Sequence, residues 1–350
     1  MRLSLVLIAS VLIAALAPPL QDQTPAAARL ADVQSWFYYL EVVPDPAVIV
    51  RLIASDYDMV VIDLVVSDQD SQDYDIAATV AALQESGKLV IAYVDIGQAE
   101  SFRSYWAAGW TPGDPAWIVG TDPDGWAENY PVAYWWDEWQ ALWFDAPHAL
   151  LDLVLDSGFD GLYMDWVEAY SDENVVVRAA REGVDPVAEM IWFVADISDY
   201  TKAAREDFII IAQNAAELAE YTDYLDRIDA VAQEQIWFDG AADGGVPEGD
   251  CPLPATDADI DGPAYIAALT AACRAQFEAY PESTLHVSSE GYLYYLKMAQ
   301  NAGKVIFTVD YALEAENVAQ VYATARALGF IPFASNRMLD RYVAPVPWGE

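Results

Sequence analysis

Short apolar runs, rich in β-branched and aromatic residues, recur along the chain and alternate with segments of helical periodicity. Eight runs predict buried strands: Trp36–Leu40, Met59–Val66, Lys88–Ile96, Gly161–Val167, Phe208–Ala215, Ala230–Phe238, Lys304–Tyr311 and Phe330–Ser335. Five segments between them predict helices: Ile76–Glu85, Ala149–Ser157, Val187–Arg205, Pro263–Tyr280 and Ala315–Ala327. Several of these helices are followed by a glycine, which is a common helix C-terminal signal.

The alternation of strand and helix predicts an α/β fold with a parallel sheet. Eight strands favour closure into a (β/α)₈ TIM barrel, and 350 residues suit one such barrel with insertions. An open doubly wound sheet is the alternative, but no glycine-rich phosphate loop follows the first strand. We therefore expect residues 29–350 to form a single TIM-barrel domain.

Two insertions interrupt the pattern, after the third and the sixth predicted strands. The first runs from about Glu100 to Asp145, and the second, rich in Gly, Pro and Asp, from Asp239 to Gly262. Both follow carboxyl ends of strands, where barrel active sites are built. The first insertion holds eight tryptophans: Trp106, Trp110, Trp117, Trp126, Trp135, Trp136, Trp139 and Trp143. These rings either wall a sugar cleft or pack on one another as a lid with its own core.

The first 28 residues have the pattern of a signal peptide. Arg2 precedes an apolar stretch, Leu3–Ala17, that is short for a transmembrane span, and small residues follow up to Ala28. The pattern predicts cleavage after Ala28 and a secreted or extracytoplasmic protein. An uncleaved anchor is the alternative.

The formal net charge of −40 argues against binding to nucleic acid or to an anionic membrane. It favours cationic or neutral partners, but the acidic residues are spread along the whole chain, which favours adaptation of the surface to high salt as its explanation. Cys251 and Cys273 are the two cysteines, and we expect a disulfide between them rather than two free thiols. The two cysteines and the two histidines, His148 and His286, do not have the spacing of zinc ligands, so we expect no metal site. We also expect no other cofactor. We expect the protein to be a monomer.

Polar residues follow several of the apolar runs at the point where each predicted strand ends. They are Asp63, Asp95, Asp165, Gln213, Asn214, Glu234, Asp310 and Tyr311. An unpaired carboxylate buried within a barrel is costly, so we expect these side chains to converge on one pocket at the carboxyl ends of the strands.

A cluster of carboxylates without cationic partners is suited to glycoside hydrolysis. That reaction needs one carboxyl to protonate the leaving oxygen and a second to attack the anomeric carbon or activate water. Crowding raises the pKa of one carboxyl and keeps it protonated. No Gly-x-Ser-x-Gly elbow is present, and both histidines lie away from the strand ends, which argues against a serine hydrolase. A carboxylate site for Mg²⁺ or Ca²⁺ stays open as an alternative.

From Ser35 to Asp340 the chain resembles glycoside hydrolase family 114, the endo-α-1,4-polygalactosaminidases. The segments that carry the resemblance are Ser35–Tyr38, Ala92–Glu100, Tyr105-Trp106, Tyr134–Gln140, Gly158–Val167, Gln213-Asn214, Glu234 and Val309–Tyr311. The most specific is the Gly-Phe-Asp-Gly-x-Tyr-x-Asp-Trp run that ends at Trp166. The chain departs from the family at Gln98, where members often have Glu.

The resemblance implies a TIM barrel that hydrolyses chains containing α-1,4-linked galactosamine. It implies Asp165 as nucleophile and Glu234 as acid/base, hence retention, with the carboxyls about 5–5.5 Å apart. The residues expected to bind substrate are Trp36, Tyr38, Asp63, Tyr93, Asp95, Tyr163, Trp166, Asn214, Asp310 and Tyr311. A carbohydrate-binding barrel without activity and a glycosidase for another α-galactoside are the alternatives.

Overall fold

The structure is a computed structural model that describes residues 25–64, 74–145, 149–281 and 283–347. The apolar stretch of the predicted signal peptide and His148 lie outside these residues. The described chain begins with helix α1 (Pro25–Leu30), which contains the predicted cleavage position and buries Ala26 and Leu30. None of the described helices has both the length and the apolar surface needed to span a bilayer.

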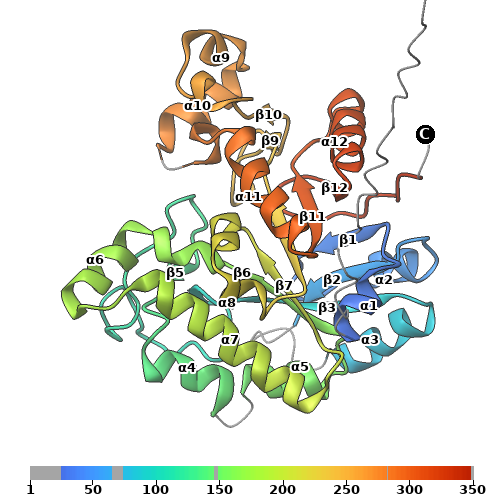
Figure 1. Ribbon diagram of the computed structural model, residues 1–350, viewed down its shortest axis with the longest axis vertical. Helices are drawn as coiled ribbons and strands as arrows, with labels where there is room; N and C mark the ends of the chain where they lie inside the picture. The colour runs from blue at the N-terminus through green and yellow to red at the C-terminus, as the bar shows by residue number, and fades with distance from the viewer. Residues whose placement is uncertain (1–24, 65–73, 146–148, 282, 348–350) are drawn as a thin grey trace, which may run out of the picture.

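Eight parallel strands form a nearly closed barrel, which confirms the predicted fold class (Figure 1). In the order in which they neighbour one another they are β1 (Trp36–Tyr39), β2 (Met59–Asp63), β3 (Leu89–Asp95), β6 (Gly161–Asp165), β7 (Ile209–Gln213), β8 (Ala230–Glu234), β11 (Val305–Asp310) and β12 (Ile331–Ala334). The last strand returns to the first, where the Trp36 indole N–H donates to the Ile331 carbonyl at 3.0 Å.

The predicted helices that border the strands agree closely with the observed ones. Helices α3 (Ile76–Glu85) and α12 (Ala315–Ala327) have the predicted bounds, and α5 (Leu150–Asp156) and α7 (Pro186–Ala204) differ by one residue at each end. Others were not predicted: α2 (Pro46–Ile53), α4 (Asp137–Phe144), α6 (Glu173–Glu182), α8 (Thr222–Leu225) and α11 (Ser289–Asn301).

The second insertion is longer than predicted. The segment Pro263–Tyr280 is two helices, α9 (Pro263–Ala268) and α10 (Ala271–Ala279), because Leu269 is extended and the Thr270 side chain caps the second helix. With β9 (Phe238–Asp239) and β10 (Cys251–Pro252), they form a lobe that stands away from the barrel (Figure 1). The lobe has its own apolar cluster and contains a disulfide between Cys251 and Cys273. Because α9 and α10 lie in this lobe, the helix that connects β8 to β11 on the outside of the barrel is α11.

The first insertion packs largely on itself. Strands β4 (Gln98–Glu100) and β5 (Asn129–Pro131) pair antiparallel ahead of α4. Ring contacts run from Trp110 to Trp117, then Trp139, then Trp143, with centroids 4.9–5.9 Å apart. These rings therefore pack on one another and join the apolar core of the barrel, so most of them neither wall the cavity nor form the separate core of the lid alternative. Of the eight, Trp126 lines the central cavity.

Candidate active site

A cavity of about 1340 Å³ lies at the carboxyl ends of the barrel strands. Both insertions and the segment after β12 contribute to its walls. The sequence-predicted residues that line it are Tyr38, Asp63, Tyr93, Asp165, Trp166, Asn214, Glu234 and Tyr311. Of the strand-end side chains expected to converge on one pocket, five line this cavity, namely Asp63, Asp165, Asn214, Glu234 and Tyr311, whereas Asp95, Gln213 and Asp310 do not.

Asp165 ends β6 and is held by two donors. The Tyr93 hydroxyl donates to Oδ2 at 2.7 Å, and the Trp166 backbone N–H donates to Oδ1 at 2.7 Å. Trp166 has a positive φ of 57°, a strained conformation that turns the chain directly after the carboxylate. Gly97 packs against this turn, where a Cβ would lie 2.3 Å from the Trp166 carbonyl oxygen, so only glycine fits. Burial and the nearby Glu234 raise the pKa of Asp165 to about 8.

Glu234 ends β8 in a similar setting. The Tyr311 hydroxyl donates to its Oε1 at 2.5 Å, and its backbone N–H donates to Asn214 Oδ1 at 3.0 Å. Asn214 and Gln235, which follow the ends of β7 and β8, have φ values of 57° and 53°. Burial raises the pKa of Glu234, and the Tyr311 hydroxyl and the Arg337 guanidinium oppose that rise.

The two carboxyls form an electrostatically linked pair. Each is half-buried, and the charge on Glu234 raises the pKa of Asp165. Such a pair retains one proton well above the usual range of a carboxylic acid. One proton shared between two carboxyls is the state that acid-assisted glycosidic cleavage requires, because one group must be acidic while the other is ionised.

Four predicted substrate-binding residues do not line the cavity. Asp310 is fully buried, and its Oδ1 accepts from the Trp237 and Phe238 backbone N–H groups at 2.7 and 3.0 Å. Asp95 likewise caps the following turn, because its Oδ1 accepts from the N–H groups of Gly97 and Gln98.

The other two are aromatic residues of the barrel interior. Trp36 is fully buried and packs against Phe307 and Phe333 with centroids 5.2 and 5.8 Å apart. Tyr163, also fully buried, packs 4.8 Å from Tyr38. Trp36, Asp95, Tyr163 and Asp310 therefore support the site from beneath, and their assignment to substrate contact is corrected to a structural one.

The expectation that the carboxylates lack cationic partners was wrong. Arg103, from the first insertion, is buried and donates to both oxygens of Asp63 at 2.6 and 2.8 Å. It also binds Glu100 at 2.7 Å. Arg337, three residues after β12, is buried and pairs with Asp239 at 2.8 Å. Both arginines lie in loops, where strand-end patterns give no signal, so sequence reasoning missed them.

The cavity also has carboxyls that the sequence did not predict, among them Glu168 and Asp124. Glu168 lies three residues after Asp165, and its Oε1 accepts from Asn214 Nδ2 at 2.8 Å. Burial and Asp165 raise its pKa well above the usual range. Asp124 lies in the first insertion, and burial raises its pKa to about 6. Within the described ranges, no group of three or more His, Cys, Asp or Glu side chains is arranged to hold a metal ion, so the Mg²⁺ or Ca²⁺ alternative has no ligand set there.

Residues 17–346 match the model of the glycoside-hydrolase family GH114. A protein of Deinococcus radiodurans is 33% identical over 293 residues, which cover 84% of this chain and 77% of that one. A Thermotoga maritima protein is 34% identical over 194 residues, 54% of this chain and 55% of that one.

Two solved structures share the fold at low sequence identity. The glycoside hydrolase domain of PelA from Pseudomonas aeruginosa has a TM-score of 0.55 at 18% identity, covering 90% of this chain and 98% of that domain. Aspergillus fumigatus Ega3, in complex with galactosamine, has a TM-score of 0.55 at 17% identity, covering 94% of this chain and 99% of that one. These two likenesses show the barrel architecture.

Proposed function

The chain belongs to glycoside hydrolase family GH114, and we propose that it is a secreted, endo-acting enzyme that cleaves galactosamine-containing polysaccharide at α-1,4 linkages. The observation that carries this proposal is the pair Asp165 and Glu234, which face the cavity and are each held by a tyrosine hydroxyl at the end of a barrel strand. Paired carboxyls in a cavity are the groups that glycosidic cleavage needs.

The charge of the cavity favours a cationic sugar. Twelve of the residues that line it are Asp or Glu, and two, Arg103 and Arg337, are cationic. Both arginines are already bound to carboxylates, so the cavity keeps an excess of negative charge. Galactosamine without an acetyl group has an ammonium at neutral pH, which such a cavity attracts. The galactosamine in the Ega3 structure supports this choice of sugar.

The mechanism that we propose is retaining. Asp165 attacks the anomeric carbon while Glu234 gives its proton to the glycosidic oxygen, so that the leaving chain departs as an alcohol. Glu234, now ionised, then takes a proton from water, and the water oxygen displaces Asp165 from the anomeric carbon. Tyr93 keeps the Asp165 carboxylate aimed, and Tyr311 does the same for Glu234.

Product analysis tests this proposal. A partly deacetylated α-1,4-galactosamine polymer is digested, fragment sizes are followed with time, and the anomeric signals of the first products are recorded by ¹H NMR. Medium-sized fragments with α-anomeric ends are expected early. Single sugars as the first products would contradict endo action, and β-anomeric ends would contradict retention. Cleavage restricted to a neutral α-galactoside would replace the proposed substrate.

The location and the oligomeric state are part of the same proposal. We propose that the enzyme meets this polysaccharide outside the cytoplasm. The N-terminal residues 1–28, with Arg2 ahead of the Leu3–Ala17 stretch, support export. We propose that the exported enzyme acts as a monomer, and light scattering of the purified chain tests this.

A further inference from the structure

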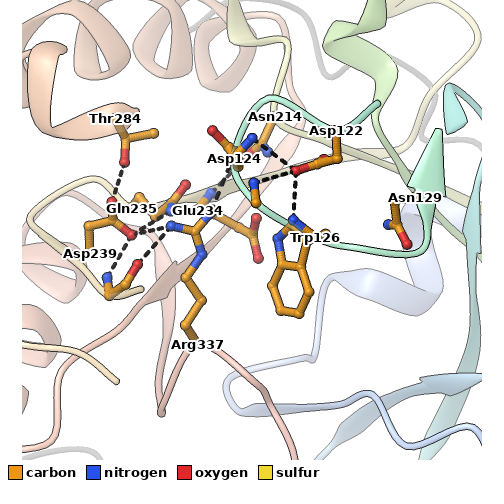
Figure 2. A network of polar contacts seen from close by, with 12 residues as sticks. Asp122, Asp124, Trp126, Asn129, Asn214, Glu234, Gln235, Asp239, Thr284 and Arg337 are labelled. Carbon is orange, nitrogen blue, oxygen red and sulfur yellow. Dashed lines mark hydrogen bonds and ion pairs between the residues drawn. The ribbon is translucent and has the colours of Figure 1, made fainter. Parts of the chain in front are cut away.

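A tight turn of the first insertion forms part of the cavity wall. In this turn, residues Asp122–Trp126 and hereafter the Asp122 turn, one carboxylate oxygen organises three consecutive donors (Figure 2). Asp122 Oδ1 accepts from the backbone N–H groups of Asp124, Gly125 and Trp126 at 2.8, 2.7 and 2.9 Å. Three charge-assisted bonds to one atom hold the turn in a single conformation.

Gln98 attaches the Asp122 turn to the barrel. Its Nε2 donates to Asp122 Oδ2 at 2.8 Å, and its Oε1 accepts from Asn129 Nδ2 at 3.0 Å. Gln98 is fully buried in β4, so its amide has a fixed position. A glutamate here would place an ionised carboxylate against Asp122 in a buried site, where like charges repel strongly. The uncharged amide of Gln98 is thus suited to holding the Asp122 turn.

Arg337 holds the opposite side of the Asp122 turn. Its Nη2 lies 3.5 Å from Asp124 Oδ2, and its Nη1 donates to Asp239 Oδ1 and to the Gly240 carbonyl, both at 2.8 Å. Asp239 also accepts from the Thr284 hydroxyl at 2.8 Å, so the second insertion braces the same guanidinium (Figure 2). Figure 2 shows Glu234 close to Arg337 and Asp124, so the Asp122 turn lies on the Glu234 side of the cavity.

Trp126 is the aromatic residue that this bracing holds at the cavity. Its backbone is fixed by Asp122, and its half-buried side chain lines the cavity. Other rings of the insertion contact one another in a row from Trp106 through Trp110 to Trp117, and they pack into the apolar core shared with the barrel. An indole face offers an apolar surface to the C–H face of a pyranose and attracts a nearby ammonium.

We propose that the Asp122 turn is a substrate-binding wall, with Trp126 as the surface on which a sugar ring of the bound polysaccharide stacks beside Glu234. Gln98 and Arg337 are positioning residues that hold this wall in place. The proposal rests on the proposed function for the identity of the sugar. The proposal adds Trp126 as the residue on which the sugar stacks, and it adds the contacts that keep Trp126 in position.

Binding to a cleavage-deficient chain tests the proposal apart from catalysis. Dissociation constants for galactosamine oligosaccharides are measured by calorimetry on Glu234→Gln, alone and combined with Trp126→Ala, Trp126→Phe or Gln98→Glu. Trp192→Ala is the matched control, because that indole is 60% exposed on α7. Thermal melts verify that each variant is folded.

The alanine variant is expected to bind about tenfold more weakly, and the phenylalanine variant to recover most of the affinity. Gln98→Glu is expected to weaken binding about as much as Trp126→Ala does. The double variant is expected to bind no more weakly than either single variant, because both changes remove the same contact between the sugar and Trp126. Trp192→Ala is expected to change nothing.

Three results separate the possible failures. Unchanged affinity in Trp126→Ala overturns the proposal while leaving the proposed function intact. Binding that depends on Trp126, in a wild-type chain that cleaves nothing, supports the wall and contradicts the hydrolase assignment to this polymer. If no galactosamine or galactose oligosaccharide binds the Glu234→Gln chain, both the substrate-binding wall and the proposed function are contradicted.

Discussion

The tyrosines that hold the two carboxyls allow the roles of Asp165 and Glu234 to be separated. Tyr93 donates to Asp165 at 2.7 Å, and Tyr311 donates to Glu234 at 2.5 Å, so each Tyr→Phe change removes one donor without removing a ring. A hydrogen bond to an ionised group contributes about 1.5–3 kcal/mol. Its loss raises the pKa of the carboxyl by about 1–2 units.

The direction of the effect differs between the two variants. In the mechanism that we propose, the active form has Asp165 ionised and Glu234 protonated. Tyr93→Phe makes ionisation of Asp165 harder, so the acid limb of the kcat/KM–pH profile is expected to move up by about 1–2 units, with a loss of about 10–100-fold at acid pH. Tyr311→Phe makes Glu234 keep its proton longer, so the alkaline limb is expected to move up instead.

The assay is reducing-end release across the pH range, with Tyr200→Phe as the control. The Tyr200 hydroxyl donates to Asp152 at the surface, at 2.6 Å, so its removal is expected to leave the profile unchanged. If Tyr93→Phe moved the alkaline limb and Tyr311→Phe the acid limb, the roles of the two carboxyls would be exchanged. If neither variant moved either limb, the paired-carboxyl mechanism would be refuted.

Three further predictions concern the supports of the site. In calorimetry, Asp165→Asn is expected to have a higher melting temperature than wild type at pH 9 but not at pH 4. The pKa of Asp165 is raised to about 8 in the folded chain, so its contribution to folding stability is present at pH 4 and is lost as the pH rises through about 8. Equal shifts at both pH values would contradict this. Gly97→Ala is expected to lower the free energy of unfolding by about 2 kcal/mol or more in urea, since its Cβ would lie 2.3 Å from the Trp166 carbonyl, and unchanged stability would contradict the close packing. Replacing Cys251 and Cys273 by serine is expected to expose the second insertion to limited proteolysis, with about 3 kcal/mol lost locally and the barrel intact; an unchanged cleavage pattern would oppose this.

The fold was largely predictable because its signals are local. Each barrel strand is a short apolar run, and helices such as α3 and α12 end just before a glycine. The exception was the second insertion, where one continuous apolar pattern hides the break at Leu269 and Thr270. That break depends on a single capping side chain, which periodicity does not detect.

The site was predictable only in part because strand ends do not reveal what covers them. Asp165 and Glu234 end strands and reach the cavity, but Asp310 ends a strand beneath the Trp237 and Phe238 backbone and is buried. All four residues of β1 are buried, so alternation did not distinguish Trp36, inside the barrel, from Tyr38 at the cavity.

The arginines were missed for a different reason. Arg103 reaches Asp63 across 40 positions, and Arg337 reaches Asp239 across 98. Such pairings arise when loops fold back over the barrel. No local pattern in the chain reports them, although each arginine follows the end of a strand by a few residues.

The most direct test of the central claim is reducing-end release from partly deacetylated α-1,4-galactosamine polymer by wild type, Asp165→Asn and Glu234→Gln. Release by wild type, with a loss of about 10³-fold or more in each variant and folded variants by thermal melting, is the predicted result. Release at wild-type rates by either folded variant would contradict the assignment of Asp165 and Glu234 as the catalytic pair.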